Sequence, residues 1–543
     1  MNKRFGILAV LVIGAGALLG GLLGRVPAKA TAGEVTPEVV VADYRTAMAL
    51  VEDGYAGKID LERVTDTSIQ GMLWSLDPHS SFFNREELKK LDEEQASQFY
   101  GIGVSIFQHR DGVYVQSVLP GTPAEKAGMR YGDRFIEIDG KDAREWSSSE
   151  VSKNVRGEKG TVVKVKIDRA ASDAPISFEI TRGGVPLPSV RNYFMLPNSV
   201  GYVGLTGGFQ QTTSEELKAA IADLKKQGLK SLILDLRGNP GGILEQAVAV
   251  VSQFIPAGKT VVSVKASRFE QNRELRSKGN DPNAFPLVVL INGGSASASE
   301  IVAGAIQDYD RGIVVGSESF GKGLVQRVFR LPYGTGLTLT TARYYTPFGR
   351  SLQRDYSHSS IYEYYSHNSD SDDPDFETPK PEGVPVTTAN GRVLYGGRGI
   401  EPDVAVDRPK NGELRSRINE AAFFFTRLLV AGKVAGLENY KNDKQNFKQS
   451  IQASEIQITD RVFEAFRQFA VSDPANGLKQ ENLQALAEYA RGRLRQELAT
   501  ADYSYEAGLQ VQIENDPQVL KATQSMAEAA KLVEIALIRP ISR

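Results

Sequence analysis

The chain opens with a short basic segment followed by a long apolar run. Lys3 and Arg4 precede an apolar stretch at 5–24, in the order typical of an export signal. Small residues at 28–30 (Ala-Lys-Ala) offer a cleavage site, yet the stretch is also long enough to span a bilayer. Residues 1–30 are therefore predicted to be a signal peptide or a membrane anchor, and both alternatives stay open. Either one makes the protein exported, hence periplasmic or otherwise extracytoplasmic.

The apolar positions that follow change their spacing twice before residue 186. Over 36–98 they recur at helical intervals, as at Tyr44, Met48 and Val51, which predicts an N-terminal helical arm. Over 99–185 the pattern shortens to strands separated by turns, which predicts a compact β-rich module. The expected strands are GIGVSIF, VYVQSVL, RFIEIDG, TVVKVKI and ISFEITR.

Apolar strands alternate with amphipathic helices over 186–406. Strand-like runs such as SLILDL and LVVLING are separated by helical patterns, so this part is predicted to be an α/β core with a mixed, largely buried sheet and flanking helices. A stretch at 356–378, rich in Ser, Asp and Tyr, interrupts the pattern and is expected to be an exposed insertion loop. Over 407–543 the spacing is helical again, which predicts a C-terminal helical extension.

Composition and charge exclude several functional classes. The 543 residues are 41% hydrophobic and 24% charged, as in a folded globular protein. Removing residues 1–30 takes away four basic residues and no acid, so the net charge moves from −2 to −6 and a nucleic-acid partner is disfavoured. There is no cysteine, and the four histidines form no HExxH motif. The chain is expected to need no metal and no cofactor.

A cluster of serines lies at a predicted strand-to-helix junction. The segment NGGSASASEIVAGAIQD, residues 292–308, follows the apolar strand LVVLI and opens a helix. Ser297 and Glu300 fit a helix-capping box, which is a purely structural explanation. A serine at a helix N-terminus also lies beside free amides that suit a developing oxyanion. From the residues alone Ser295, Ser297 and Ser299 are equivalent candidates for a nucleophile.

A lysine between two glycines follows in the segment GSESFGKGLVQRVF, residues 316–329. A serine hydroxyl needs a base, no histidine lies in these motifs, and Lys322 can take that role. Residues 316–322 also mimic a phosphate-binding loop. Gly323 stands where such a loop needs Ser or Thr, and the pattern that follows is a strand, so nucleotide binding is disfavoured.

A third motif, LILDLRGNPGG at 232–242, ends a buried strand in a glycine turn that can present amides to an anion. Together DLRGNPGG, GSASASEI, FGKGLVQ and TARYYTPFGRSLQ resemble the C-terminal processing peptidases, or tail-specific proteases, over roughly residues 36–405. The resemblance implies Ser297 as nucleophile, Lys322 as base and Gln326 as the group that orients the lysine. It also implies an oxyanion hole formed by the amides of Ala298 and Gly241, with Gly242 as the alternative to Gly241.

The β-rich module resembles a PDZ domain. Gly101, Ile102 and Gly103, with the later SVLPGTPAEKAGMRYGDRFIEIDGK, match the carboxylate-binding loop and the middle of that domain. Glycines there let successive amides converge on a peptide carboxylate, so a polypeptide with a free apolar C-terminus is the expected partner. Arg156 resembles an arginine that couples the PDZ domain to the catalytic core. The arm at 36–98 resembles a region that can mediate dimerisation.

These patterns predict an exported serine endopeptidase that cleaves polypeptides at or near their C-termini through a Ser–Lys dyad. The predicted domains are the export segment (1–30), the helical arm (36–98), an inserted PDZ domain (99–185), the α/β protease core (186–406) and the helical extension (407–543). The alternative is a non-catalytic PDZ scaffold that binds protein C-termini in the cell envelope. The sequence assigns no role to the extension.

Overall fold

The computed structural model describes residues 36–266, 271–357, 364–365, 383–407, 412–448, 450–452 and 454–538. The predicted export segment at 1–30 lies outside them. In the described ranges no helix combines the length and the apolar character needed to cross a bilayer. The chain divides into one unit that ends at Gly71 and a second that begins at Met72.

The first unit contains helix α2 (Pro37–Gly54) and most of α3 (Leu61–Trp74). Within it the hydroxyl groups of Tyr44 and Ser68 are 2.5 Å apart. Helix α2 buries none of its residues, and Val39, Val40 and Leu50 are exposed. The helical periodicity of this region therefore predicted the helices correctly.

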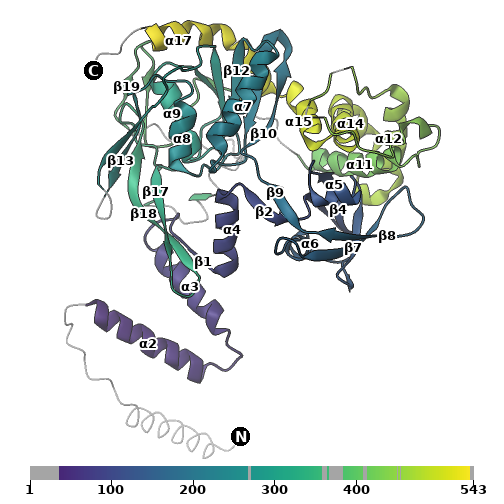
Figure 1. Cartoon of the computed structure of the whole chain (residues 1–543), viewed down its shortest axis with the longest axis horizontal. Coiled ribbons are helices and arrows are strands. Elements are labelled where there is room, and N and C mark those ends of the chain that lie inside the picture. Colours follow the sequence, from purple (N-terminus) through teal and green to yellow (C-terminus); the bar gives the residue numbers. More distant parts are fainter. Residues whose placement is uncertain are drawn as a thin grey trace, which may run out of the picture. The chain divides into compact units, whose positions relative to one another are not determined.

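A largely parallel sheet forms the centre of the second unit (Figure 1). Its strand order is β10-β11-β12-β15-β16-β21, and only β10 runs antiparallel to its neighbour. The strands are β10 (Val190–Leu196), β11 (Val200–Leu205), β12 (Ser231–Asp235), β15 (Leu287–Ile291), β16 (Ile313–Gly316) and β21 (Val404–Ala405). Every residue of β12 and β15 is buried, because helices cover both faces.

The two faces of this sheet pack against different helices. On one face Leu232, Leu234 and Val289 join a core with α7 (Thr213–Lys226), α8 (Leu244–Val251) and α9 (Ala298–Asp308). On the other face Ile233 and Val288 pack against α16 (Pro517–Gln524) and α17 (Met526–Ile538). Successive side chains of a β-strand point to opposite faces of the sheet. The apolar residues of a single strand therefore pack into two different cores. The predicted α/β core with flanking helices is confirmed.

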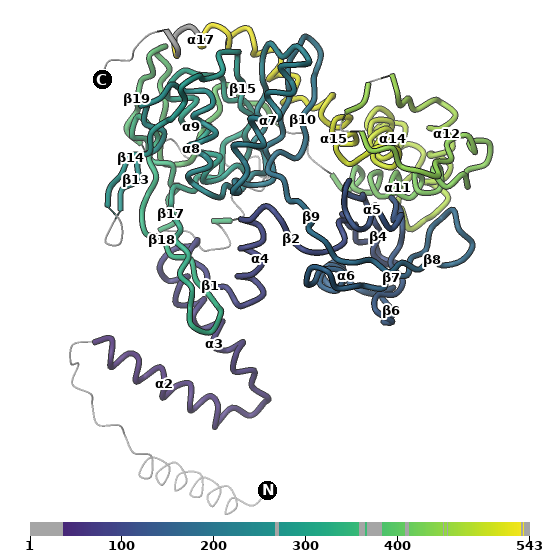
Figure 2. The backbone as a smooth tube through the Cα atoms, in the orientation of Figure 1, coloured from purple at the N-terminus to yellow at the C-terminus, as the bar shows by residue number. Residues whose placement is uncertain are grey.

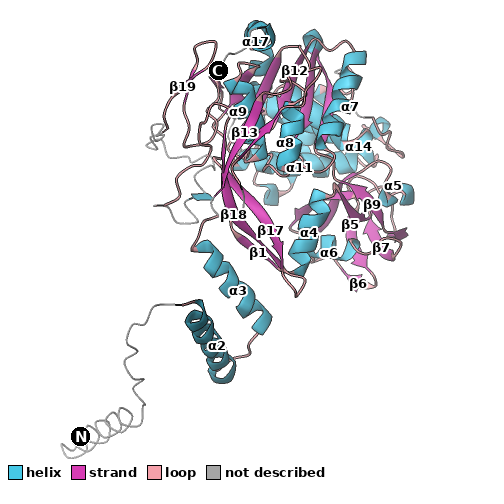
Figure 3. Cartoon of the chain, turned by 60° about the vertical axis from the view of Figure 1, so that its left-hand side comes forward, coloured by secondary structure: helices cyan, strands magenta, loops and turns pink. Residues whose placement is uncertain are grey.

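A second sheet contains β1, β13, β17 and β18, which are labelled in Figure 3. Its order is β1-β18-β13-β14, with β17 paired to β18. The strands are β1 (Ser81–Phe83), β13 (Thr260–Ala266), β14 (Arg273–Arg276), β17 (Leu324–Arg330) and β18 (Gly336–Tyr345), and helix α4 (Arg85–Gln95) follows β1. β17 begins two residues after Lys322, which agrees with the strand expected there. The predicted arm at 36–98 therefore contributes one strand, β1, to this sheet.

The module at 99–185 forms a small antiparallel sheet of order β3-β4-β5-β7-β8, with β6 paired to β5. Its elements are β3 (Val104–His109), β4 (Gly112–Val118), α5 (Pro123–Ala127), β5 (Arg134–Ile138), β6 (Lys141–Asp142), α6 (Ser148–Val155), β7 (Val162–Asp168) and β8 (Ile176–Thr181). The chain enters and leaves through β2 (Gln98–Gly101) and β9 (Gly183–Pro186), which pair antiparallel (Figure 2). Adjacent entry and exit are the geometry of an inserted domain, as predicted.

The C-terminal extension is helical, as predicted. It comprises α11 (Glu413–Val430), η2 (Glu438–Tyr440), α12 (Asp460–Ser472), η3 (Pro474–Asn476), α13 (Gln480–Ala485), α14 (Ala487–Asp502), α15 (Tyr505–Glu514), α16 and α17. Its first helices share a core of their own, and α16 and α17 cover the central sheet. Three short elements complete the described chain: η1 (Pro197–Ser199), β19 (Val386–Thr387) and β20 (Val393–Leu394).

Candidate active site

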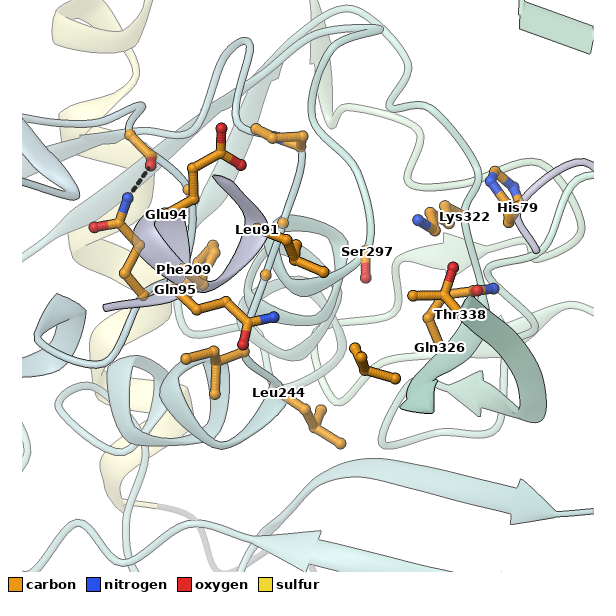
Figure 4. Close-up of a pocket in the computed structure, with 18 of the residues that line it drawn as sticks. His79, Leu91, Glu94, Gln95, Phe209, Leu244, Ser297, Lys322, Gln326 and Thr338 are labelled. Carbon is orange, nitrogen blue, oxygen red and sulfur yellow. Dashed lines mark hydrogen bonds between the residues drawn. The ribbon is translucent and has the colours of Figure 1, made fainter. Parts of the chain in front are cut away.

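A cavity of about 1000 Å³ lies where the central sheet meets β17 and α4. Ser297, Lys322, Gln326 and Gly241 all line it, so the structure brings together catalytic candidates from three separate motifs. Figure 4 shows Ser297 and Lys322 among the side chains that line this cavity. The polypeptide connects these positions only through long segments, and it is the sheet that places their strand ends side by side.

The three serines of the cluster differ in their surroundings. Ser295 and Ser299 are fully buried, and their hydroxyls donate to the carbonyl oxygens of Leu236 (2.8 Å) and Asn239 (3.0 Å). Ser297 lines the cavity and caps α9 with φ 56° and ψ −111°. A non-glycine residue with this backbone is strained, and such strain concentrates at functional sites. The geometry thus separates Ser297 from its two neighbours, which the sequence did not.

Glu300 ties the serine segment to the lysine segment. One oxygen of its carboxylate accepts the backbone N–H groups of Ser297 (2.7 Å) and Lys322 (2.9 Å). The other oxygen accepts the Gly321 N–H (2.7 Å) and the Ser319 hydroxyl (2.6 Å). Burial raises the pKa of Glu300, and the four donors oppose that shift because they favour the ionised carboxylate. The capping residue expected from the sequence therefore also holds the lysine loop.

Lys322 is placed to lose its proton easily. Burial lowers the pKa of its amine, and the charges of Glu300 and Asp77 oppose this shift. Among the described residues no carboxylate lies within ion-pair distance of the amine. A buried amine without an ion-pair partner favours its neutral form, and the neutral form is the one that can act as a base.

Gln326 offers an unused acceptor to this region. Its side-chain N–H donates to the Thr340 hydroxyl at 2.7 Å, which fixes the orientation of the amide. Its carbonyl oxygen is buried and has no hydrogen-bond partner in the described part of the chain. Figure 4 shows Gln326 on the lysine side of the cavity. The carbonyl can accept a hydrogen bond from an amine without contributing a full negative charge.

The amides available to an oxyanion come from two places. Ala298 is the first residue of α9, and its N–H lacks a partner among the described residues, as expected at a helix start. In the glycine turn (residues 238–242) the Gly241 N–H donates to Asn239 Oδ1 at 2.9 Å. The Gly242 N–H, by contrast, makes no hydrogen bond within the described ranges. Both glycines line the cavity, so the choice between them stays open.

His79 is a site residue that the sequence analysis missed. It lines the cavity beside Lys322 (Figure 4), and its Nε2 is 2.9 Å from the Tyr364 hydroxyl. Burial lowers its pKa to about 3, with a further lowering by the charge of Lys322, so it is neutral at ordinary pH. It follows Asp77, whose carboxylate accepts its backbone N–H at 2.8 Å. Its only sequence signal is the segment LDPHSSFF at residues 76–83, which lies within the region predicted to be the helical arm.

The stretch at 356–378 also reaches this region. Most of it lies outside the described residues, but Tyr364 is only 2% exposed and its hydroxyl accepts a hydrogen bond from Gln353 at 3.1 Å. The expectation of an exposed loop is therefore wrong at Tyr364. Its aromatic ring packs against His79 and Phe320, which the spacing of polar residues could not reveal.

The predicted PDZ residues occupy two distinct positions. Gly103 has φ 89°, and a Cβ there would overlap the Thr122 side chain. Ile102 is buried in the core of the module, so it anchors the loop. Gly101 ends β2. None of these three lines the catalytic cavity within the described structure.

Arg156, by contrast, lines the catalytic cavity. Its guanidinium lies over the Phe99 ring at 4.1 Å and is 3.8 Å from Glu93 of α4. The residue ends α6 of the module, so it connects the module to the wall of the cavity. No three His, Asp or Glu side chains of the described residues converge as they would around a metal ion.

Comparison with known proteins gives consistent matches. Residues 199–358 match peptidase family S41, and residues 90–168 match the PDZ domain. The carboxy-terminal-processing protease of Bartonella bacilliformis is 38% identical over 299 residues, which cover 54% of this chain and 68% of that protein. The carboxy-terminal processing protease CtpA of Bacillus subtilis is 35% identical over 305 residues, which cover 56% of this chain and 65% of that protein. The chain thus spans about two thirds of these relatives.

Among solved structures, one titled photosystem II D1 C-terminal processing protease is 28% identical. The alignment covers 69% of this chain and 94% of that chain, with a TM-score of 0.35.

Proposed function

Since the chain belongs to the carboxy-terminal processing proteases of peptidase family S41, we propose that it is a serine endopeptidase that cleaves exported polypeptides at or near their C-termini. The observation that carries this proposal is the pairing in one cavity of a strained Ser297 with a lysine that has no carboxylate partner in the described structure. A scaffold that only binds protein tails would need neither feature.

In the proposed mechanism, neutral Lys322 takes the proton from the Ser297 hydroxyl as its oxygen bonds to the scissile carbonyl carbon. The carbonyl oxygen becomes an oxyanion and accepts hydrogen bonds from the Ala298 amide and one amide of the glycine turn. The lysine then gives the proton to the departing amine, and an acyl-enzyme remains. Water, deprotonated by the same lysine, releases the second product and restores Ser297. Gln326 orients the lysine through its unpaired carbonyl oxygen.

Substrate recognition is proposed to begin at the PDZ domain. The amides at 101–103 would bind the terminal carboxylate, and the edge of β3 would accept the tail as an added strand. The position of Arg156 on the cavity wall supports its proposed role in coupling the domain to catalysis. Export through residues 1–30 and dimerisation through the helical arm remain part of the proposal.

The test uses the purified chain with casein and with a peptide that ends in a free apolar carboxylate. Ser297→Ala, Lys322→Ala and Lys322→Arg should each abolish cleavage, because arginine stays protonated and cannot act as a base. Ser299→Ala is the matched control and should retain turnover, since it loses only one buried hydrogen bond to Asn239. A wild-type chain that binds the tail but cleaves nothing would favour the scaffold instead.

A further inference from the structure

A buried charged cluster lies directly before the glycine turn. Arg237 follows β12, and its guanidinium donates to both oxygens of Asp235, at 3.0 Å through Nε and 2.6 Å through Nη2. Asp235 also accepts the Tyr202 hydroxyl at 2.7 Å. The Arg237 side chain is only 9% exposed, so each of its N–H groups needs a partner inside the protein.

The remaining partners of Arg237 come from the C-terminal extension. Its Nη1 donates to Asp516 Oδ2 at 2.8 Å and to Gln518 Oε1 at 2.7 Å. Gln518 is fully buried and donates to the carbonyl oxygen of Val406 at 2.7 Å. Asp516 also caps α16, because its Oδ1 accepts the Gln518 N–H at 2.8 Å. Two residues that lie 279 and 281 positions away in sequence thus complete the hydrogen bonding of one guanidinium.

Arg237 connects the C-terminal extension to the segments that carry the proposed catalytic residues. The next residue, Gly238, begins the glycine turn and donates its N–H to Asn292 at 2.8 Å. Asn239 then accepts the Ala296 N–H at 3.0 Å through its carbonyl oxygen, one residue before Ser297. A shift of Arg237 would therefore move the turn against the serine segment, and sub-ångström misplacement of oxyanion donors is costly to catalysis.

We propose that Asp516 and Gln518 are positioning residues for the oxyanion hole, acting through Arg237, so that the C-terminal extension completes the active site. The inference rests on the proposed peptidase function. It gives the extension a catalytic purpose that its helical pattern alone did not suggest. The same extension packs on the PDZ domain, where Phe423 joins a cluster with Tyr114 and Tyr131. One helical body therefore touches both the recognition domain and the support of the glycine turn.

The decisive variant is Asp516→Asn, because asparagine keeps the helix cap and removes the charge that faces Arg237. We expect kcat on a short peptide without a PDZ-binding tail to fall about tenfold, with KM changed less than about twofold. The affinity for a peptide boronate, which binds as a tetrahedral adduct, should fall in parallel with kcat. Asp516→Ser, which also keeps a capping oxygen, should behave in the same way and serves if the asparagine variant folds poorly.

Glu514→Gln is the matched control. It removes an ion pair of 2.8 Å to Arg495 inside the same extension, without contact to Arg237, and should leave kcat unchanged. Wild-type kcat and boronate affinity in both Asp516 variants would overturn the proposal, provided that the wild-type chain is active. If Glu514→Gln loses as much activity as the Asp516 variants, the extension contributes only to general stability. That result would also overturn the proposal.

A double-mutant cycle then tests the route through Arg237. If Asp516 acts only through that guanidinium, Arg237→Gln combined with Asp516→Asn should be no less active than Arg237→Gln alone, because glutamine removes the charge that faces Asp516. Effects that multiply would show that Asp516 acts elsewhere. If the wild-type chain itself cleaves nothing, the peptidase proposal fails first, and this result is distinguishable from inactivity limited to the Asp516 variants.

Discussion

Two glycine-containing turns of this molecule are proposed to present backbone amides to an anion, and they are built differently. The glycine turn of the core contains Gly241 at φ 96°, and the PDZ loop contains Gly103 at φ 89°. Both glycines lack room for a Cβ, which at Gly241 would lie 2.8 Å from the Ser297 Cβ. The glycine turn of the core is held by buried polar groups such as Asn239 and Arg237, whereas the PDZ loop is anchored by apolar Ile102.

The difference matches the two proposed tasks. An oxyanion exists only in the transition state, so its donors must be held in place in advance, and charged hydrogen bonds fix direction as well as distance. A substrate carboxylate is present from the start, so a loop that is correctly anchored but adaptable is sufficient. Disturbing the first turn should therefore change kcat, and disturbing the second should change KM.

The largest effect is expected from Gly241→Ala. The new Cβ would press on Ser297 and on the Ala298 amide, and kcat should fall about 100- to 1000-fold with little change in KM. Gly238→Ala is the control in the same turn, because its Cβ would meet no atom within 4 Å. Steady-state kinetics on a short peptide measure both variants. Equal losses in the two would mean that backbone strain, and not the approach to Ser297, is responsible.

The next effect concerns Gly103→Ala, which should raise KM for a protein with a free apolar tail about tenfold or more. Its kcat on a short peptide without such a tail should stay at the wild-type value. Gly121→Ala is the control, since that glycine also has positive φ but open space around its Cβ. A fall in kcat on the short peptide would contradict the separation of the two turns.

A third prediction uses pH to locate the base. Besides Lys322, the groups that face the amine are Glu300, Asp77 and neutral His79. Because only the neutral amine accepts a proton, kcat/KM should rise with pH through the Lys322 pKa. Gln326→Glu adds a negative charge, raises this pKa and should move the rising limb up by about one pH unit.

Glu300→Gln is the opposing variant. It removes a negative charge that raises the pKa of Lys322, so the rising limb should move to lower pH while kcat falls, because an amide cannot accept four donors. Profiles measured from about pH 6 to 10 compare the two variants. If the rising limbs of the kcat/KM profiles of both variants coincide with that of the wild type, another group takes the proton from Ser297.

The smallest effect is expected for Arg156→Gln. The contacts with Phe99 and Glu93 lie at a partly exposed site, where such interactions are worth about 1 kcal/mol or less. Activity on tail-bearing protein should fall a few-fold, while binding of the tail itself, measured by calorimetry, should not change. Weaker tail binding would place Arg156 in the recognition site and not in the coupling.

Much of this architecture was readable from local pattern. The helical and strand periodicities predicted the α/β core, the inserted β-rich module and the helical ends, because burial on one or two faces imposes its period directly on the sequence. The motifs at 238–242, 295–300 and 321–326 indicated the candidate site, since each carries a turn that requires glycine or a helix start that accepts a capping residue.

Other features depended on contacts that no local pattern records. Apart from the family resemblance, which implied Ser297, the local pattern left Ser295, Ser297 and Ser299 equivalent. Only the fold buries Ser295 and Ser299 against Leu236 and Asn239. The sequence assigned no role to His79, because this residue lies in none of the glycine- and serine-rich motifs. The pairing of β1 with β18 brings it to the cavity. The sequence indicated only that the extension is helical. The hydrogen bond between Asp516 and Arg237 appears only in the folded structure.

The sequence by itself therefore determined the periodic elements, the turns and the candidates for the reactive groups, since these follow from the properties of neighbouring residues. Only the tertiary structure decided which serine faces the cavity, which carboxylate links the serine to the lysine and which distant helix supports the glycine turn. Those choices depend on which buried polar groups come into contact. Every buried hydrogen-bond donor needs an acceptor, and in the folded protein that acceptor can belong to a residue far away in sequence.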